Sequence, residues 1–129
     1  MIHVAVVDDD AEERRRIKEY LDGISAKRGI EFSVREFTDG SSFIGTYTPE
    51  YDIVLMDIEM PGMNGLESAR QLRSLDTAVI IIFVTRMANL AAKGYEVDAL
   101  DFIVKPIDSY AFSLKISRAL SRVASSADK

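Results

Sequence analysis

Residues 4–10 read Val-Ala-Val-Val-Asp-Asp-Asp, a short apolar run that ends directly in three carboxylates. Two further segments, residues 52–56 and 79–84, are similarly dominated by Val, Ile and other apolar residues. Strands covered by helices on both faces have such uninterrupted apolar sequences, whereas strands with one solvated face alternate. We therefore expect these three segments to be the central strands of a parallel sheet.

Two weaker strand candidates lie at residues 32–37 and 102–104. The first carries Arg35 and Glu36 and the second is short, features that edge strands tolerate. Between the strands, apolar residues recur three and four positions apart, as on the buried face of an amphipathic helix. These positions are Ile17, Tyr20, Leu21, Ile24, Leu66, Ala69, Leu72, Leu75, Phe112, Ile116, Ala119, Leu120 and Val123.

Capping residues mark where the three clearest helices begin. Asp10, Asn64 and Asp108 precede them, and a side-chain oxygen at such a position accepts a backbone N–H of the first turn. Glu13 and Glu67 follow the first two caps by three residues, which is the spacing of a capping box. These signals place the helix starts directly after strand ends.

Residues 41–47 and 88–95 are predicted to be two shorter helices with weaker patterns. Five strands alternating with five helices through short connections predict an α/β fold, a doubly wound five-stranded parallel sheet. A chain of 129 residues accommodates one such domain. We assign residues 1–120 to it, and residues 121–129 to the end of the last helix and the start of a linker or tail.

The composition argues against several classes of protein. With 16 basic and 21 acidic residues the formal net charge is −5, so this chain lacks the positive charge that attracts nucleic acid. No apolar run approaches the ~20 residues of a membrane-spanning helix. The chain has no cysteine and no recognisable signal peptide, so we expect a cytoplasmic protein. The single histidine, His3, begins the first strand and is predicted to be inert.

Polar side chains stand where four of the predicted strands end. Asp8 and Asp9 follow the first strand, Asp57 the third, Thr85 ends the fourth, and Lys105 follows the fifth. Ligands of open α/β sheets bind beyond the carboxyl ends of the strands. Carboxylates gathered there would repel one another unless a cation lay among them. Oxygen ligands without cysteine or a nearby histidine favour Mg²⁺ or a related ion such as Mn²⁺.

The same residues predict phosphoryl transfer. Asp57 can attack phosphorus as a carboxylate nucleophile and form an acyl phosphate. The metal, the Lys105 ammonium and the Thr85 hydroxyl would each stabilise charge on the transferred group. A strand-end aspartate is more often a helix cap, and we favour that interpretation for Asp10. Capping does not explain the whole set, because caps need neither a cation nor a nucleophile on different strands.

At this point the residues resemble a known family. Residues 6–10 (VVDDD), 55–65 (LMDIEMPGMNG), Thr85 and 102–106 (FIVKP) are similar to the receiver domain of bacterial two-component response regulators. Residues 99–106 (ALDFIVKP) resemble receivers that are joined to LytTR-type DNA-binding domains (LytR/AlgR type). The resemblance implies the flavodoxin-like strand order 2-1-3-4-5. It covers the chain from the first strand to the last helix.

The resemblance implies a phosphoacceptor and a metal site. Asp57 would accept the phosphoryl group from a sensor histidine kinase. Asp9 and Asp57 would ligate Mg²⁺ or Mn²⁺ directly, and Asp8 would act through water. The backbone carbonyl of Glu59 would be the third protein ligand.

The resemblance also implies a switch. Lys105 would pair with the phosphoryl group, Thr85 would move toward it, and Phe102 would be the aromatic residue that follows Thr85 inward. We expect the signal to leave through the face formed by residues 88–95, the last strand and the last helix, which would change its self-association as a homodimer. A DNA-binding effector domain that regulates transcription would lie beyond this chain.

Two local features refine the expected site. Arg86 and Met87 follow Thr85, where the family commonly has a small residue first. Arg86 could screen the site from water, bind phosphoryl oxygens, or point into solvent. We also expect the Lys105–Pro106 bond to be cis, because the ammonium must turn back into the site and X-Pro bonds adopt cis readily.

Three other functions fit these residues less well. In a phosphatase of the haloacid-dehalogenase type an Asp-x-Asp motif supplies a general acid, and Asp57-Ile58-Glu59 is only superficially similar. An interaction module that no longer takes phosphate would not need the intact polar set. A flavodoxin-like FMN protein would not place three aspartates after its first strand, since they would repel the phosphate. We therefore expect a signalling switch that catalyses only its own phosphoryl transfer and dephosphorylation.

Overall fold

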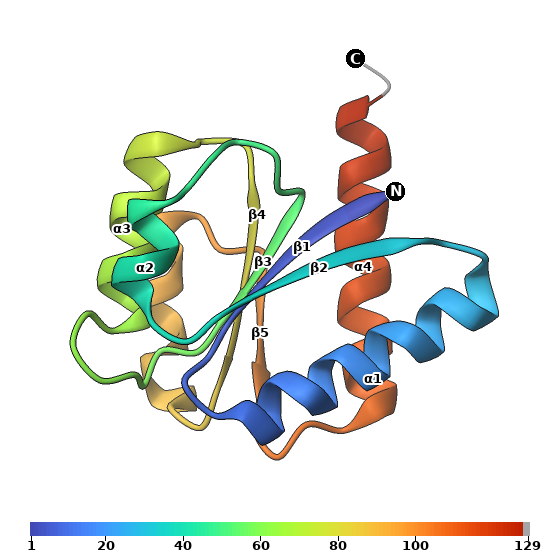
Figure 1. Cartoon of the computed structure of the whole chain (residues 1–129), viewed down its shortest axis with the longest axis horizontal. Coiled ribbons are helices and arrows are strands. Elements are labelled where there is room, and N and C mark those ends of the chain that lie inside the picture. The colour runs from blue at the N-terminus through green and yellow to red at the C-terminus, as the bar shows by residue number, and fades with distance from the viewer. Residues whose placement is uncertain (128–129) are drawn as a thin grey trace.

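The computed structural model of the chain describes residues 1–127 and contains one parallel sheet with strand order β2-β1-β3-β4-β5 (Figure 1). The strands are β1 (Ile2–Val7), β2 (Phe32–Phe37), β3 (Ile53–Met56), β4 (Ile80–Thr85) and β5 (Asp101–Val104). β2 and β5 lie at the edges, as their short or charged sequences predicted. The doubly wound parallel sheet and its strand order are therefore confirmed.

Helices cover both faces of this sheet. They are α1 (Ala11–Arg28), α2 (Gly40–Gly45), α3 (Gly65–Leu75), η1 (Ala88–Val97) and α4 (Ser109–Ala127), of which η1 has 3₁₀ geometry. Figure 1 shows α1 and α4 on one face, and α2, α3 and η1 on the other. This arrangement confirms the five predicted helices.

Alternate residues of the central strands supply two separate hydrophobic cores. In β1, Val4 and Val6 belong to the core beneath α1 and α4, whereas Ala5 and Val7 belong to the core beneath α2 and α3. Successive side chains of a strand point to opposite faces, so a strand between two helical layers needs an apolar residue at every position. The polar residues that follow such a strand stand out for this reason.

Asp10 caps α1 as predicted. Its Oδ1 accepts the backbone N–H groups of Glu12 at 2.9 Å and Glu13 at 3.4 Å. The second half of the predicted capping box is wrong, because the N–H of Asp10 donates to Asp8 Oδ1 at 2.9 Å instead of to Glu13. The buried Oε2 of Glu13 has no hydrogen-bond partner within residues 1–127.

The structure defines where α3 and α4 end. Leu75, which we assigned to the buried face of α3, is exposed because it is the last residue of the helix and no further turn packs over it. Residues 121–127 continue α4, and residues 128–129 lie outside the described part of the chain.

Among the described residues, no helix is long and apolar enough to cross a membrane.

The start of α3 packs directly against the backbone that follows β3. A Cβ atom at Gly65 would collide with the carbonyl group of Asp57 and would lie 2.8 Å from Ile58 Cα. The N–H of Gly65 donates to the Ile58 carbonyl oxygen at 2.9 Å. Only glycine allows this approach, so residue 65 helps to set the position of the Asp57 loop.

We expect Gly65→Ala to lower the free energy of unfolding by about 1–3 kcal/mol, since the colliding atoms are backbone and overpacking has costs of that size. Gly23→Ala is the matched control, because a Cβ at this exposed position in α1 meets nothing within 4 Å. Replacing a mid-helix glycine by alanine should stabilise the fold by about 0.5–1 kcal/mol. Urea unfolding of both variants measures the difference, and equal effects would contradict the packing role of Gly65.

Candidate functional site

The carboxyl ends of β1, β3 and β5 bring three of the predicted site residues together. Asp8 follows β1, Asp57 follows β3, and Lys105 follows β5. The three strands are parallel members of one sheet, so residues that are 48 and 97 positions apart in sequence meet at the same rim. All three side chains are buried, with at most 8 % of each residue exposed.

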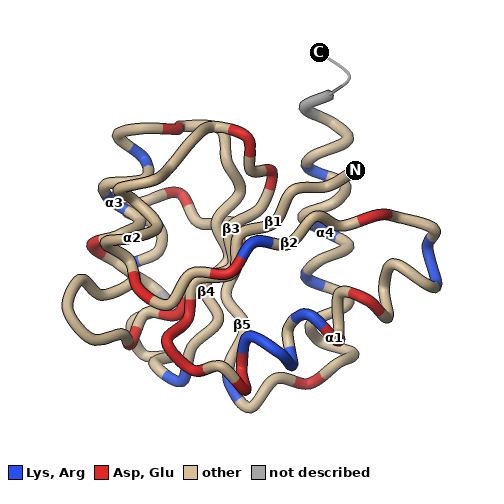
Figure 2. Tube along the Cα trace, in the orientation of Figure 1, with Lys and Arg blue, Asp and Glu red and all other residues tan. Residues whose placement is uncertain are grey.

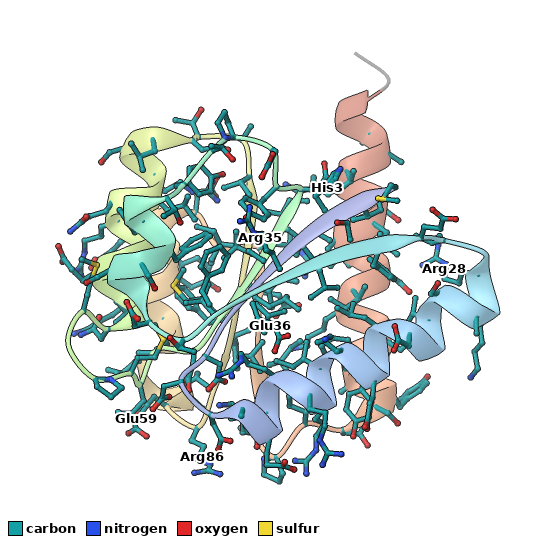
Figure 3. All side chains as sticks on the ribbon, viewed as in Figure 1. His3, Arg28, Arg35, Glu36, Glu59 and Arg86 are labelled. Carbon is teal, nitrogen blue, oxygen red and sulfur yellow. The ribbon has the colours of Figure 1, made fainter. Side chains whose placement is uncertain are left out.

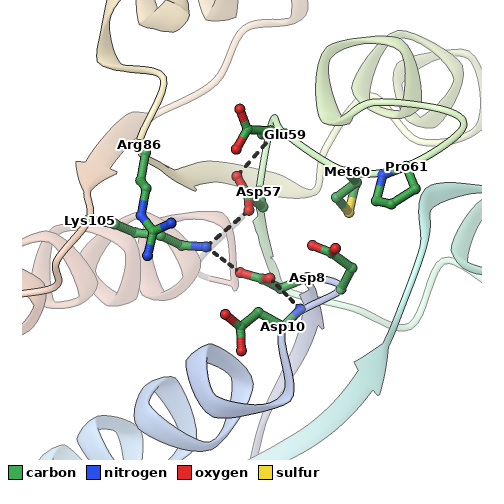
Figure 4. Close-up of a pocket in the computed structure, with 9 residues that line it drawn as sticks. Asp8, Asp10, Asp57, Glu59, Met60, Pro61, Arg86 and Lys105 are labelled. Atoms are coloured by element: carbon green, nitrogen blue, oxygen red, sulfur yellow. Dashed lines mark hydrogen bonds and ion pairs between the residues drawn. The ribbon is translucent and has the colours of Figure 1, made fainter.

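The Lys105 ammonium bridges the two carboxylates. Its Nζ lies 2.8 Å from Asp8 Oδ2 and 3.0 Å from Asp57 Oδ2, as the dashed lines in Figure 4 mark. Both are charge-assisted hydrogen bonds, which are shorter and stronger than neutral ones. A buried ion pair of this kind holds its partners in place even where its net contribution to stability is small.

The remaining carboxylate oxygens of Asp8 and Asp57 accept backbone N–H groups. Asp8 Oδ1 accepts the N–H of Asp10 at 2.9 Å, and Asp57 Oδ1 accepts the N–H of Glu59 at 3.1 Å. Arg14 also ties down this rim, because its Nη1 donates to the carbonyl oxygen of Asp8 at 2.7 Å. Each carboxylate is therefore oriented by two separate donors.

Burial and charge act in opposite directions on the pKa values of this cluster. Desolvation raises the pKa of Asp8 above 3.8, and the bonds from Lys105 and Asp10 only partly counteract it. For Lys105, desolvation lowers the pKa, but the two carboxylates outweigh it and the net pKa lies above 10.5. The ammonium therefore stays charged at neutral pH, whereas the ionised form of Asp8 is held at some cost to stability.

The arrangement of carboxylates fits a divalent cation. Oxygens of Asp8, Asp9 and Asp57 all lie within 4.8 Å of one another. Asp9 is exposed, and within residues 1–127 its carboxylate makes neither a hydrogen bond nor an ion pair. Hard oxygen ligands with open access to water are those that Mg²⁺ takes, since it retains several waters.

An open pocket of about 440 Å³ is lined by Asp8, Asp9, Asp57 and Lys105. Its wall also contains Asp10, Glu59, Met60, Pro61 and Arg86. Figure 2 shows the acidic residues continuing from the end of β1 into the start of α1. Figure 3 shows Glu59 and Arg86 at the same edge of the molecule, where the strands end. Asp10 is therefore both the predicted helix cap and part of the pocket wall.

The two predicted switch residues lie outside the pocket wall. Thr85 is fully buried, and its Oγ1 accepts the backbone N–H of Met87 at 3.0 Å. Phe102 is half-buried on the edge strand β5, and the ammonium of Lys115 lies 4.8 Å from its ring centroid. The structure thus brings Asp8, Asp57 and Lys105 into direct contact. Thr85 and Phe102 do not line the pocket that these residues form.

Backbone geometry at the rim agrees with the sequence analysis. The Lys105–Pro106 bond is cis, as predicted. Gly62, in the loop after Asp57, has φ +73°, a left-handed conformation that residues with a Cβ rarely adopt.

Sequence reasoning did not single out Lys115, because its local pattern is that of an ordinary lysine on a helix surface. No local signal connects it with Phe102.

Comparison with known proteins gives consistent matches. A family model described as a response regulator receiver domain matches residues 4–117. The positive alginate biosynthesis regulatory protein of Pseudomonas aeruginosa is 32% identical over 108 residues, which are 84% of this chain and 43% of that protein. The aerobic respiration control protein ArcA of Escherichia coli is 34% identical over 124 residues, 93% of this chain and 49% of that protein.

Solved structures also resemble the chain. The crystal structure of the response regulator TrrA from Thermotoga maritima in complex with Mg²⁺–BeF has a TM-score of 0.79 at 26% identity. The match covers 92% of this chain and 99% of that one. In sequence, by contrast, the chain spans about half the length of the curated relatives that it matches.

The raised pKa of Asp8 predicts a pH-dependent stability difference. A carboxyl group whose pKa is higher in the folded than in the unfolded state destabilises the fold as pH rises from 3.8 through the raised pKa. In the absence of divalent cations, we expect Asp8→Asn to have a higher free energy of unfolding than the wild type at pH 7. The difference should shrink toward zero below pH 3.8.

Urea unfolding as a function of pH measures this effect. Asp22→Asn, on the exposed side of α1, is the control and should change the free energy of unfolding by no more than about 0.5 kcal/mol. An Asp8→Asn variant that is less stable than the wild type at pH 7 would contradict the assignment of a net burial penalty to Asp8.

Proposed function

The chain belongs to the family of response regulator receiver domains, and we propose that its phosphoacceptor is Asp57, charged in a divalent-cation-dependent reaction by a sensor histidine kinase. One observation carries the proposal. The buried Lys105 ammonium bridges Asp57 to Asp8, with Asp9 beside them at the pocket mouth. The proposed nucleophile, a fixed ammonium and a set of carboxylates that could hold a metal ion thus line one pocket.

The transfer step follows from this arrangement. A carboxylate oxygen of Asp57 forms a bond to phosphorus while the bond between phosphorus and the donor breaks. The electron pair of the broken bond leaves with the donor. The donor atom is a histidine nitrogen in a kinase or an oxygen in acetyl phosphate. Lys105 is then placed to pair with an oxygen of the transferred group, since its ammonium already contacts Asp57 at 3.0 Å.

A bound Mg²⁺ or Mn²⁺ would neutralise charge on the phosphoryl oxygens. Asp9, Asp57 and the backbone carbonyl of Glu59 would hold it, with Asp8 acting through water. The three carboxylates support this assignment because their oxygens already lie within 4.8 Å of one another. For Glu59, support is limited to the residue itself, which lines the same pocket.

The proposed switch starts at Thr85. Its hydroxyl would give up the Met87 N–H and donate to a phosphoryl oxygen, and Phe102 would rotate into the space that Thr85 leaves. The phosphoryl group supplies the energy through its negative charge and strong acceptor oxygens. Changes would then reach the face formed by η1, β5 and α4, where exposed Tyr95, Val104 and Leu114 could support homodimerisation.

The wider context belongs to the same proposal. The chain would act in the cytoplasm as a switch that catalyses only its own phosphorylation and dephosphorylation. Its relatives are about twice as long and include regulatory proteins of respiration and alginate synthesis. We therefore propose that a DNA-binding effector domain outside this chain, of the LytTR type, regulates transcription when Asp57 is phosphorylated.

We expect incubation with acetyl phosphate and Mg²⁺ to add one phosphoryl group to the wild type, measured by intact mass. EDTA should prevent the gain, because the metal neutralises the transferred group. Asp57→Ala should abolish it, whereas Asp10→Ala removes a carboxylate of the same pocket wall and should leave the nucleophile active. A full mass gain in Asp57→Ala would contradict the assignment.

Arg86 gives the pocket a cation that the family pattern does not predict. Its side chain is exposed, it lines the pocket, and within residues 1–127 it makes no hydrogen bond or ion pair (Figure 4). Loss of the acyl phosphate requires water to add to phosphorus while the bond to the Asp57 oxygen breaks and the carboxylate recovers its electron pair. The proton of water passes to phosphate or solvent. We propose that the Arg86 guanidinium contacts the phosphoryl oxygens and obstructs this attack.

We expect Arg86→Ala to shorten the lifetime of the phosphorylated protein by roughly two- to fivefold, the size of a partly exposed ionic contact. Arg86→Lys should lie between the two, since an ammonium keeps the charge but loses the bidentate fork. The decay of the phosphorylated mass after removal of the donor measures each lifetime. Identical lifetimes for Arg86→Ala and the wild type would show that the side chain serves only as a solvated surface charge.

A further inference from the structure

We propose that Lys115 is the residue that positions the switch aromatic Phe102, holding its ring in the half-exposed orientation of this structure. The proposal deepens the proposed function and rests on the switch role of Phe102. Lys115 lies in α4, across from the edge strand β5, and is not part of the phosphorylation pocket.

Lys115 contacts both the backbone and the ring of Phe102. Its Nζ donates to the Phe102 carbonyl oxygen at 2.6 Å and lies 4.8 Å from the ring centroid. An ammonium within about 6 Å of an aromatic face is attracted by the ring quadrupole. Lys115 therefore favours the ring position that keeps this contact.

Asp101 completes the cluster around Phe102. Its Oδ1 accepts the N–H of Phe102 at 2.8 Å and pairs with Lys115 Nζ at 3.1 Å. The side chains of Asp101 and Lys115 are 17% and 31% exposed, so water screens this pair only partly. Arg118 also pairs with Asp101, at 3.5 Å, but is 61% exposed.

The ring has space into which it can move. A hollow of about 460 Å³ lies beside Phe102 and is also lined by Phe83, Gly94 and Ala99. In the sheet, Phe102 is paired with Phe83 of β4, two residues before Thr85. In the proposed switch, rotation of the ring toward Thr85 breaks the present contact between the Lys115 ammonium and the ring.

Lys115 thus acts as a bias on a two-state equilibrium. If both ring positions exist before phosphorylation, a contact made only in the half-exposed position lowers the fraction of molecules whose Phe102 ring is in the inward position. Ligands that select the inward state then bind more weakly by the same factor. A contact between a partly exposed cation and an aromatic ring corresponds to a factor of roughly two to five.

Titration with beryllofluoride and Mg²⁺, an acyl-phosphate mimic that cannot be hydrolysed, measures this factor. We expect Lys115→Met, which keeps the length but removes the charge, to bind beryllofluoride roughly two- to fivefold more tightly than the wild type. Lys115→Arg should restore wild-type affinity, because it keeps a cation over the ring. Arg118→Met is the matched control, since Arg118 pairs with the same Asp101 and lines the same hollow, but among the described residues it makes neither a hydrogen bond nor a cation–ring contact with Phe102.

A separate readout follows the ring directly. Without beryllofluoride, the aromatic NMR resonances of Phe102 in Lys115→Met should shift toward their beryllofluoride-bound positions, and those of Arg118→Met should not. A purely structural role for Lys115 predicts the opposite sign in the titration, because a loosened fold binds the mimic more weakly.

Equal affinities of Lys115→Met and Arg118→Met, or weaker binding by Lys115→Met, would overturn the positioning role alone, provided that the wild type binds. Failure of the wild type to bind beryllofluoride with Mg²⁺ would instead overturn the proposed function, and this proposal with it. Tighter binding by Lys115→Met, with rescue by Lys115→Arg, would support the positioning role of Lys115.

Discussion

The buried ammonium of Lys105 between the carboxylates of Asp8 and Asp57 is the interaction on which the site depends. It joins the ends of three strands, and its 2.8 and 3.0 Å contacts require β1, β3 and β5 to end at the same height. Without this cation, two buried carboxylates would face each other with only backbone N–H groups to stabilise them. The cis Lys105–Pro106 bond directly follows the lysine of this contact, and the glycine at residue 65 packs against the backbone of its Asp57.

The same site shows how function and stability oppose each other in this fold. Desolvation raises the pKa of Asp8, so its charged form is held in the pocket at the expense of stability. Asp9 stands exposed, with no partner for its carboxylate within residues 1–127. A cation bound among these groups would remove part of that penalty, because a nearby opposite charge favours the ionised form of a carboxylate.

In the proposed switch, communication with the surface would pass through residues that do not line the pocket. Thr85 is bonded to Met87, and Phe102 is held by Lys115 and Asp101 on the edge strand. Close packing makes such elements move between discrete arrangements and not by continuous deformation. η1 is suited to such a change, since it has 3₁₀ geometry and no side-chain cap, and Arg73 holds its carboxyl end through the carbonyl groups of Val97 and Asp98.

Sequence alone determined the layered α/β fold, because continuous apolar strands and amphipathic helices are local patterns with fixed periods. It also identified the polar residues that end the strands, since these interrupt apolar runs at the rim where ligands bind. Only the tertiary structure decided which oxygen meets which donor: Asp8 Oδ1, and not Glu13, takes the N–H of Asp10. It likewise revealed the contact between Lys115 and Phe102, 13 residues apart, and the place of Arg86 in the pocket wall. Long charged side chains reach several partners, and which one they meet depends on how distant segments pack, for which no local sequence period exists.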